Sequence, residues 1–261
     1  MRRWGLTPDG GPIHTPSSDL LPVRFAGGPA MLKVARVEEE KVGHRLMVWL
    51  GGEGAARALR HDGAALLLER VEGDLSLTEM VQGGEDDEAS RVLCGVVREL
   101  HAARPQPWPE LTPLTRWFRS LEAAAPAHGG PLTLALETAR QLLARPQDVR
   151  PLHGDLHHGN VLHSRERGWL AIDPKGLIGE RGFEYANIFC NPDLEIATGP
   201  GRLARQAQIV SEAAGLERPR LLRWILAYAG LSAAWWLEDG RTGEAQSALE
   251  VARIAAAELS A

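Results

Sequence analysis

The sequence predicts an α+β protein of two lobes, a small β-rich lobe over residues 1–73 and a larger, mainly helical lobe over residues 74–261. Short apolar runs between Gly- and Pro-rich turns, with a single helical stretch, fill the first lobe. After Asp74 the apolar residues recur at helical spacing instead. A third pattern, a polar hairpin at residues 151–174, interrupts the helical part.

Size and composition indicate a globular protein, and its net negative charge suits a cationic substrate. A chain of 261 residues with 44% hydrophobic and 24% charged residues can bury a sizeable core. Its formal net charge of −5 disfavours a nucleic-acid partner, because phosphates attract a basic surface. Among 29 Lys and Arg residues the lysines are Lys33, Lys41 and Lys175. Any role that requires a lysine therefore has three candidates.

The chain is expected to work in a reducing compartment and away from membranes. Its two cysteines, Cys94 and Cys190, stand in unrelated contexts, which indicates neither a disulfide framework nor a thiol metal site. The first twenty residues contain no apolar run typical of a signal peptide. The longest apolar tract, residues 221–237, is interrupted by Arg223 and is too short for a membrane span. These features predict a cytoplasmic location.

The β-rich lobe begins with a turn-linked region over residues 1–30, with an extended piece around Val23–Phe25. A strand is predicted at Ala30–Val34. The helix predicted over Val37–Leu50 opens with an acidic run, and negative charge stabilises a helix N-terminus. A glycine-rich turn ends this helix, and Ala64–Leu68 is a candidate for a buried strand.

The second lobe consists of amphipathic helices. One is predicted over Glu85–Ala103, where apolar residues recur on one face. The next is predicted from Thr112 to Ala125, with Pro113 at its first helical position. Further helices are expected at residues 131–144, 183–190, 201–214, 219–237 and 243–259. The helical lobe thus surrounds the hairpin region.

The hairpin region, PLHGDLHHGNVLHSRERGWLAIDP at residues 151–174, is the most informative stretch. Asp155 is followed by Asn160 five positions later and by Asp173 eighteen positions later. Apolar residues on both sides of the turn at Arg165–Gly168 predict two paired strands. The hairpin therefore brings Asn160 and Asp173 to the same side.

These side chains are suited to phosphate chemistry. Asn160 and Asp173 offer a neutral and an anionic oxygen to Mg²⁺, which takes its other ligands from water and substrate phosphates. Asp155 stands beside the metal as a carboxylate able to orient a hydroxyl and accept its proton. The same parts in the same order form the catalytic loop and the metal aspartate of protein kinases. His153 is expected to pack and hydrogen-bond beneath the loop.

The segments HGDLHHGN and IDP resemble the aminoglycoside phosphotransferase branch of the protein-kinase-like fold. Their continuation, IDPKGLIGERGFEYANIF, is similar to the streptomycin 6-phosphotransferase (aminoglycoside/hydroxyurea resistance kinase) subfamily. ERVEGD at residues 69–74 and GLSAAWWLEDG at residues 230–240 extend the resemblance, which reaches most of the chain from about Met31 onward. Protein kinases carry Arg and Phe where Gly154 and Pro174 stand, which favours a small-molecule kinase.

The resemblance implies a bilobal protein-kinase-like fold that uses ATP and Mg²⁺. Lys33 would hold the nucleotide phosphates, fixed by an ion pair with a glutamate of the following helix. Alignment with the family favours Glu40 as that partner, whereas helical periodicity alone leaves Glu39 open. Lys175, two residues after the metal aspartate, is placed either to contact the transferred phosphoryl group or to lie in a surface turn.

Other nucleotide contacts follow from the family pattern. Backbone groups of Glu69, Arg70 and Val71 would face the adenine edge. No G-x-G-x-x-G motif precedes Lys33, and the loop that covers the phosphates is expected within residues 15–22, whose serines at 17 and 18 offer hydroxyl or backbone N–H groups. The acceptor implied by the resemblance is an aminoglycoside, streptomycin at its 6-hydroxyl, whose phosphorylation gives antibiotic resistance.

A polycationic acceptor requires carboxylates for its amines or guanidines and aromatic faces for stacking. The candidates after the catalytic hairpin are Glu180, Glu184, Asp193, Glu195, Trp235, Trp236, Glu238 and Asp239. Each of them alone is equally typical of a solvated charge or a core aromatic residue.

Three other functions are compatible with parts of this sequence. The first is a kinase of another small hydroxylated metabolite, and the second is a non-catalytic nucleotide-binding pseudokinase, which is disfavoured because no expected catalytic group is missing. The third is a zinc hydrolase with His157, His158 and His163 as ligands. Adjacent histidines point in different directions and no H-E-x-x-H motif is present, which disfavours zinc.

Overall fold

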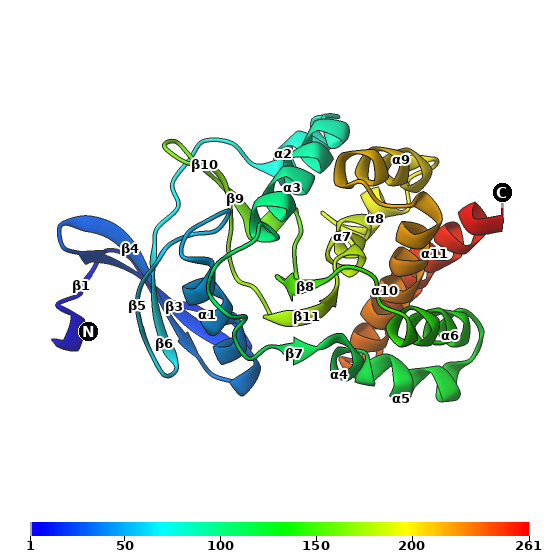
Figure 1. Ribbon diagram of the computed structural model, residues 1–261, viewed down its shortest axis with the longest axis horizontal. Coiled ribbons are helices and arrows are strands. Elements are labelled where there is room, and N and C mark those ends of the chain that lie inside the picture. The colour runs from blue at the N-terminus through cyan, green and yellow to red at the C-terminus, as the bar shows by residue number, and fades with distance from the viewer. Residues whose placement is uncertain (1, 261) are drawn as a thin grey trace.

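The computed structural model describes residues 2–260. A β-sheet lies at one end of the molecule and a body of helices at the other, with the catalytic hairpin between them (Figure 1). The sheet has six strands in the order β1-β3-β4-β6-β5, with β2 paired to β3, and all pairs are antiparallel. The strands are β1 (Thr7–Pro8), β2 (Ile13–His14), β3 (Ser18–Phe25), β4 (Gly28–Ala35), β5 (Ala58–Asp62) and β6 (Ala65–Glu69).

The two faces of this sheet pack against different partners. On one face a small cluster forms around Val23, Ala30 and Leu67. The other face contributes Leu66 and Leu68 to the main core, which continues through the first helix into the helical lobe. Side chains alternate between the faces along each strand, so a single strand can serve both clusters.

Helix α1 (Glu38–Leu50) confirms the helix predicted after the acidic run. It ends where Gly51 adopts the left-handed conformation with φ of 62°, a conformation that glycine adopts without steric cost. Gly43 lies at the point of closest approach to the catalytic segment, since a Cβ there would stand 1.9 Å from the carbonyl oxygen of Pro174. The absence of a side chain at this position lets α1 pack directly on the segment after Asp173.

The helical lobe contains ten α-helices within the described residues. They are α2 (Leu77–Gln82), α3 (Asp86–Leu100), α4 (Leu114–Trp117), α5 (Arg119–His128), α6 (Gly130–Ala144), α7 (Gly182–Ala186), α8 (Leu194–Ala197), α9 (Arg202–Ala214), α10 (Arg218–Glu238) and α11 (Thr242–Ser260). Two short 3₁₀ helices, η2 (His158–Asn160) and η3 (Asn187–Cys190), accompany them, and a third, η1 (Arg2–Trp4), precedes β1. No helix within residues 2–260 is long and apolar enough to cross a membrane.

The helices predicted from periodicity are confirmed as α3, α6, α9, α10 and α11. The prediction for residues 183–190 is realised as α7 followed by η3. The helix predicted from Thr112 is wrong at its start, because Thr112–Pro113 forms the short strand β7 and helical structure begins at Leu114. The short helix α2, capped by the side chain of Ser76, was not predicted.

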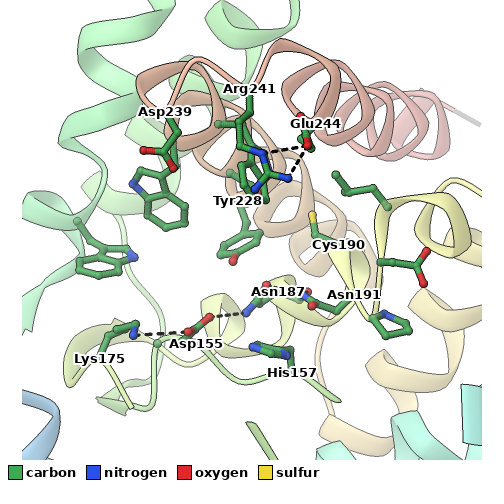
Figure 2. A pocket seen from close by; sticks show the side chains of 18 of the residues that line it. Asp155, His157, Lys175, Asn187, Cys190, Asn191, Tyr228, Asp239, Arg241 and Glu244 are labelled. Atoms are coloured by element: carbon green, nitrogen blue, oxygen red, sulfur yellow. Dashed lines mark hydrogen bonds and ion pairs between the residues drawn. The ribbon is translucent and has the colours of Figure 1, made fainter. Parts of the chain in front are cut away.

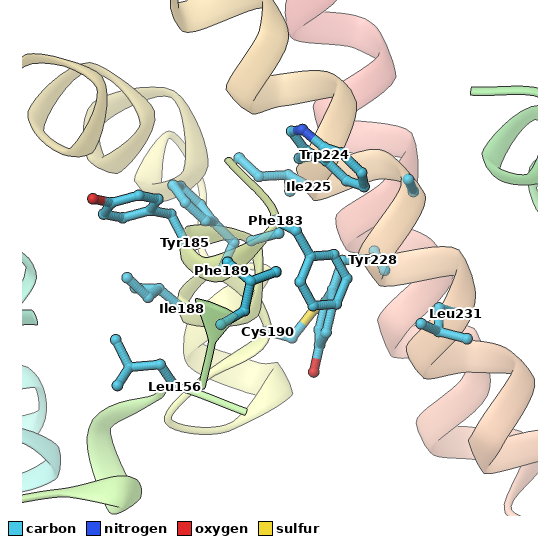
Figure 3. Packing of buried hydrophobic residues seen from close by; sticks show 14 of the residues in the cluster. Leu156, Phe183, Tyr185, Ile188, Phe189, Cys190, Trp224, Ile225, Tyr228 and Leu231 are labelled. Atoms are coloured by element: carbon cyan, nitrogen blue, oxygen red, sulfur yellow. The ribbon is translucent and has the colours of Figure 1, made fainter. Parts of the chain in front are cut away.

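Helix α10 is the centre of the helical lobe, and it packs against α5, α6, α7, α9 and α11. Its aromatic residues meet those of α7 edge to face (Figure 3), with ring centroids 5.7 Å apart for Phe183 and Trp224 and 5.8 Å apart for Phe183 and Tyr228. Such edge-to-face pairs are favoured by the quadrupoles of the rings. This cluster fixes α7 beneath the catalytic loop.

Two small sheets frame the catalytic residues. Strands β9 (Val161–Ser164) and β10 (Gly168–Ala171) form the predicted antiparallel hairpin. Strand β11 (Leu177–Glu180) pairs antiparallel with β8 (Val149–Leu152) and parallel with β7. The β9–β10 hairpin thereby brings Asn160 close to the segment before Asp173, and the Ile172 N–H donates to the Asn160 carbonyl oxygen at 2.9 Å.

Candidate active site

The loop after β8 is held by a buried carboxylate and a buried imidazole. Glu184 of α7 accepts hydrogen bonds from the backbone N–H groups of His153 (2.6 Å) and Gly154 (2.8 Å). The His153 ring bonds the Ile172 carbonyl oxygen through Nε2 (2.7 Å) and accepts from the Asp155 N–H at Nδ1 (3.2 Å). Burial lowers the pKa of His153, which favours the neutral ring that these two bonds require. His153 packs beneath the loop, as expected.

The Asp155 carboxylate is surrounded by three side chains, of which Figure 2 shows Asn187 and Lys175. Its Oδ1 accepts a hydrogen bond from Asn187 Nδ2 at 3.0 Å, and its Oδ2 lies 3.4 Å from Asn160 Nδ2 and 3.8 Å from Lys175 Nζ. Asn187 is itself oriented, because Asn191 donates to its Oδ1 at 2.8 Å. The carboxylate therefore has a defined orientation at the surface of the cavity beside it.

Asn160 and Asp173 line one cavity at the base of the hairpin. Asn160 Nδ2 donates to the Asp155 carbonyl oxygen at 2.9 Å, which leaves Oδ1 available as a ligand. Asp173 has a φ of 60°, a left-handed conformation that is uncommon outside glycine and recurs at functional sites. One amide oxygen and one carboxylate fit the limited protein coordination that Mg²⁺ requires when phosphates supply further ligands.

Lys33 of β4 forms a buried ion pair with Glu40 of α1. Its ammonium group also pairs with Asp173. The alternative partner, Glu39, points away and pairs with Arg119 at 2.7 Å. The choice that periodicity left open is therefore decided in favour of Glu40, which is 3% exposed.

Glu40 is the meeting point of several groups. The Ser18 hydroxyl donates to its Oε2 at 2.9 Å, and Lys175 Nζ lies 3.3 Å from its Oε1. Burial raises the pKa of Glu40, but the ammonium groups of Lys175 and Lys33 outweigh burial and lower the pKa to about 2. Glu40 is thus a carboxylate that connects the sheet with the catalytic segment.

Lys175 points into the site and is not a surface turn lysine, since its side chain is 23% exposed. Burial lowers the pKa of Lys175, but the carboxylates of Asp173, Asp155 and Glu40 outweigh it, and the net shift is upward. The charged ammonium group lies among these three carboxylates.

A cavity of about 260 Å³ separates the sheet from the hairpin. It is lined by Thr15, Ser18, Leu20, Met31, Lys33, Leu68, Glu69, Arg70, Val71, Asn160, Leu162, Ile172 and Asp173. The side chains of Glu69 and Arg70 are engaged elsewhere, with Arg167 and Asp9 respectively. This is consistent with the expectation that the backbone groups of residues 69–71, and not their side chains, contact the adenine edge of a nucleotide. The Ser18 hydroxyl donates to Glu40. Within residues 15–22, phosphate contacts would therefore come from groups other than this hydroxyl.

A second, larger cavity of about 680 Å³ opens on the other side of Asp155. Figure 2 shows Asp155 and Lys175 at one end and Arg241 and Glu244 at the other, with Tyr228 between them. Its aromatic lining is Trp117, Tyr228, Trp235 and Trp236, its carboxylates are Glu39, Asp155, Asp193, Asp239 and Glu244, and its cations are Arg119, Lys175 and Arg241. Carboxylates therefore outnumber cations in the lining, which suits a cationic acceptor.

Several predicted acceptor residues do not reach this cavity. Glu180 is 3% exposed and is bound by Arg220 and by the Trp224 indole N–H at 2.7 Å, so it stabilises the helical lobe instead. Glu184 is 1% exposed and holds the catalytic loop from beneath. Glu238 accepts a hydrogen bond from Ser120 at 3.1 Å outside the cavity. Trp235, Trp236, Asp193 and Asp239 line the cavity, whereas Glu195 does not.

The three histidines of the zinc alternative are separated in the structure. His157 lines the larger cavity. His158 is 2% exposed, and neither of its ring nitrogens is hydrogen-bonded. The His163 ring packs on Trp169, with ring centroids 5.1 Å apart. Burial lowers the pKa of His158 to about 4. Among residues 2–260 no group of three His, Cys, Asp or Glu side chains is arranged to hold a metal ion. The zinc alternative has no ligand set in this part of the chain.

Several residues of the site are not among those predicted from the sequence. Asn187 and Asn191 belong to the segment FEYANIF and its continuation, which carried the resemblance, and their amide side chains were the available signal. Trp117 and Tyr228 come from separate helices and have no local signature. The Arg241–Glu244 pair resembles an ordinary surface pair in the sequence.

The chain was compared with known proteins. A family model described as aminoglycoside/hydroxyurea antibiotic resistance kinase matches residues 3–240. Over 257 residues the chain is 52% identical to a streptomycin 3″-kinase of Klebsiella pneumoniae, with 97% of this chain and 96% of the relative covered. It is 34% identical over 271 residues to a streptomycin 6-kinase of Streptomyces griseus, with 97% and 86% covered.

The structural comparison agrees. A crystal structure of a thermostable mutant of the aminoglycoside phosphotransferase APH(4)-Ia, in a ternary complex with ADP and hygromycin B, superposes with a TM-score of 0.71. The superposition covers 98% of this chain and 96% of that chain at 16% identity, and it establishes the predicted bilobal protein-kinase-like fold. The chain therefore belongs to the aminoglycoside/hydroxyurea antibiotic resistance kinase family and is a small-molecule kinase that phosphorylates an alcohol group.

Proposed function

We propose that this protein transfers the γ-phosphoryl group of ATP to a hydroxyl group of streptomycin and thereby gives resistance to the antibiotic. One observation carries the proposal. Asp155 lines the cavity of about 680 Å³, the acceptor cavity, and also contacts Asn160, which lines the cavity of about 260 Å³, the nucleotide cavity. A hydroxyl group bound at Asp155 therefore lies beside a phosphate bound at Asn160. The similarity to streptomycin kinases supports this acceptor, and structural relatives crystallised with ADP or AMP-PNP support the donor.

Each residue then has a definite task. Lys33 binds the nucleotide phosphates, and Asn160 and Asp173 would hold Mg²⁺, which would supply neutralisation of phosphate charge. Asp155 orients the acceptor hydroxyl and takes its proton late in the transfer. Most of the acceleration comes from placement and from charge neutralisation, because phosphoryl transfer requires little covalent help from the protein.

The position of phosphorylation is the 3″- or the 6-hydroxyl. The family resemblance in the motifs pointed to the 6-hydroxyl, but the relative named for the 3″ position is 52% identical to this chain and the relative named for the 6 position is 34% identical. The 3″-hydroxyl is the better supported of the two. Phosphorus–proton correlation NMR of the purified product distinguishes them, because the coupled ring proton identifies the esterified carbon.

The proposed function is tested by measuring ADP release with Mg²⁺ and ATP over a panel of aminoglycosides and simple alcohols. We expect turnover and a phosphorylated product with streptomycin. Asp155→Ala should lower kcat by roughly 10²- to 10⁴-fold with nucleotide affinity retained, because it removes the proton acceptor only. Glu195→Gln, which changes an exposed carboxylate outside both cavities, should leave turnover unchanged.

Different outcomes separate the alternatives. Turnover with a simple alcohol alone indicates a kinase of another metabolite. Nucleotide binding without transfer to any acceptor indicates a pseudokinase. Wild-type turnover by Asp155→Ala contradicts the assignment of the catalytic carboxylate.

A further inference from the structure

One cationic side chain of the protein itself lies in the acceptor cavity. The Arg241 guanidinium carbon is 4.4 Å from the centroid of the Trp236 ring, and Arg241 Nε donates to Glu244 Oε1 at 2.9 Å. All three residues line the acceptor cavity, and Figure 2 shows Arg241 and Glu244 at the end opposite Asp155. A flat cation is thus stacked on an indole and bonded to a carboxylate, which is the arrangement that binds guanidinium ligands.

The surroundings of this pair are anionic. Asp239 lines the same cavity, and no cation among residues 2–260 forms an ion pair with it. Trp235 and Trp236 precede it on the last turn of α10. The outer end of the cavity therefore combines aromatic faces with two carboxylates and a single arginine.

We propose that Trp236 and Glu244 form a guanidinium subsite of the acceptor cavity, which Arg241 fills until a guanidino group of the acceptor displaces it. The proposal rests on the proposed function, because streptomycin carries guanidino groups and most small alcohols do not. The subsite would anchor the acceptor at the outer end of the cavity while a hydroxyl group reaches Asp155 at the inner end.

Only the Arg241 side chain has to move in this exchange. Its backbone N–H donates to the Trp236 carbonyl oxygen at 2.8 Å and its own carbonyl oxygen accepts from Ala245 at 3.1 Å, so the turn between α10 and α11 stays in place. The side chain is 53% exposed and can extend into solvent. The displaced guanidinium group keeps its hydration, which makes the exchange inexpensive.

The carboxylate remains in position when Arg241 leaves. Glu244 lies in the first turn of α11, where the unpaired N–H groups and the helix dipole stabilise negative charge. The hydrogen bond from Arg241 lowers the pKa of Glu244 most, and a backbone N–H lowers it further. The second contribution persists after displacement, so a ligand guanidinium meets a prepared carboxylate.

Arg241 consequently acts as an internal competitor. An exposed ion pair and an exposed cation–π contact are each weak, and the acceptor must first break both. Removing Arg241 should therefore lower the KM for streptomycin by about three- to tenfold. The kcat should change less than about twofold, because Asp155 lies at the other end of the cavity.

The test compares two similar arginine–glutamate pairs, one where α11 begins and one within α11. Arg241→Ala removes the competitor, whereas Arg253→Ala removes an arginine of similar exposure from the Arg253–Glu250 pair outside this cavity. We expect a lower KM for streptomycin in Arg241→Ala and an unchanged KM in Arg253→Ala. Trp236→Ala and Glu244→Gln should each raise the KM about tenfold, since they remove the face and the charge of the subsite.

A second measurement does not depend on phosphoryl transfer. Ligand-observed NMR measures the binding of methylguanidinium, with methylammonium as a cation that lacks the planar group. Arg241→Ala should bind methylguanidinium several-fold more tightly than the wild-type protein does, and Glu244→Gln less tightly. Methylammonium should show no such difference between the variants.

The outcomes separate this inference from the proposed function. Absence of phosphoryl transfer to streptomycin by the wild-type protein overturns the proposed function, and methylguanidinium binding still decides the subsite. A KM for Arg241→Ala equal to or above that of the wild-type protein overturns the role of Arg241 as a competitor. Equal affinity of the wild-type protein and Glu244→Gln for methylguanidinium overturns the subsite.

Discussion

The orientation of Asp155 depends on a buried amide that belongs to a different segment of the chain. Asn187 is 5% exposed, donates to Asp155 Oδ1, and is itself oriented by Asn191. This hydrogen bond restricts rotation of the carboxylate within the acceptor cavity, which Asn187 also lines. A carboxylate free to rotate would spend less time aimed at the acceptor hydroxyl.

Asn187→Ala should lower kcat by about 10- to 100-fold, since a hydrogen bond to a charged group contributes about 1.5–3 kcal/mol. The KM for ATP should stay within about threefold, because Asn187 does not line the nucleotide cavity. Asn191→Ala, which loosens Asn187 without removing it, should lower kcat by a few-fold. Steady-state kinetics of both variants checks the split, and a wild-type kcat for Asn187→Ala would exclude the positioning role.

At the scale of elements, the distance between α1 and the catalytic segment is set by Gly43. A Cβ at this position would stand 1.9 Å from the Pro174 carbonyl oxygen, so both backbones would have to separate. Glu40, one turn earlier on the same helix, would move with it. The pairing of Glu40 with Lys33 and Lys175 therefore depends on a glycine.

Gly43→Ala should destabilise the protein by about 1–3 kcal/mol through this overlap and raise the KM for ATP. The matched control is Gly95→Ala in α3, where a Cβ meets nothing within 4 Å. Because alanine favours a helix over glycine, the control should gain about 0.5–1 kcal/mol. Urea unfolding and ATP kinetics of the two variants check this, and equal stability changes would show that the close approach carries no strain.

Helix α1 also carries a buried histidine that makes the fold sensitive to acid. His44 is 2% exposed and neither ring nitrogen is hydrogen-bonded. Burial, followed by the charge of Lys33, lowers the pKa of His44 from 6.5 to about 4. The folded state thus binds this proton less readily than the unfolded chain does. The contribution of His44 to the free energy of unfolding is fully present above the unfolded pKa, and it is lost as the pH falls from about 6.5 towards about 4.

His44→Leu should remove this pH dependence. Between about pH 7 and about pH 5 the wild-type protein should lose about 2 kcal/mol more unfolding free energy than the variant, because the unfolded chain alone takes up the proton. Urea titrations at both pH values measure the difference. Parallel losses in the two proteins would mean that His44 is protonated without cost in the folded state.

For the whole molecule, the nucleotide cavity connects the two lobes. Its lining comes from the sheet on one side and from the hairpin on the other, and Lys33 of the first lobe pairs with Asp173 of the second. A nucleotide bound there contacts both lobes in the folded state and neither in the unfolded chain. Its binding must therefore stabilise the protein against unfolding.

ATP with Mg²⁺, at roughly 100 times its Kd, should add about 2.7 kcal/mol of stability and raise the Tm by roughly 5–10 °C. Removal of Mg²⁺ with EDTA should abolish most of this rise, as should Asp173→Ala. Asp239→Ala, which changes a carboxylate of the other cavity, should preserve it. A Tm rise that is insensitive to EDTA would show that the nucleotide binds without the metal.

The sequence alone determined the local parts of this protein. The hairpin and the long helices follow from periodicity and turn residues within short windows, and the structure confirms them. A resemblance carried by the same short motifs was enough to select the family. Such features depend on neighbours a few positions away, which a sequence displays directly.

Only the tertiary structure decided which distant residues meet. The sequence predicts Glu180 and Glu184 as acceptor ligands, because an isolated carboxylate does not reveal its partner. In the structure Glu180 pairs with Arg220, and Glu184 binds the catalytic loop. Strand β7 pairs with a strand more than sixty positions away, which no local pattern of Thr112–Pro113 shows. The acceptor cavity and its Arg241–Trp236 stack likewise arise from helices that packing alone brings together, because contact energies depend on proximity in space and not on separation along the chain.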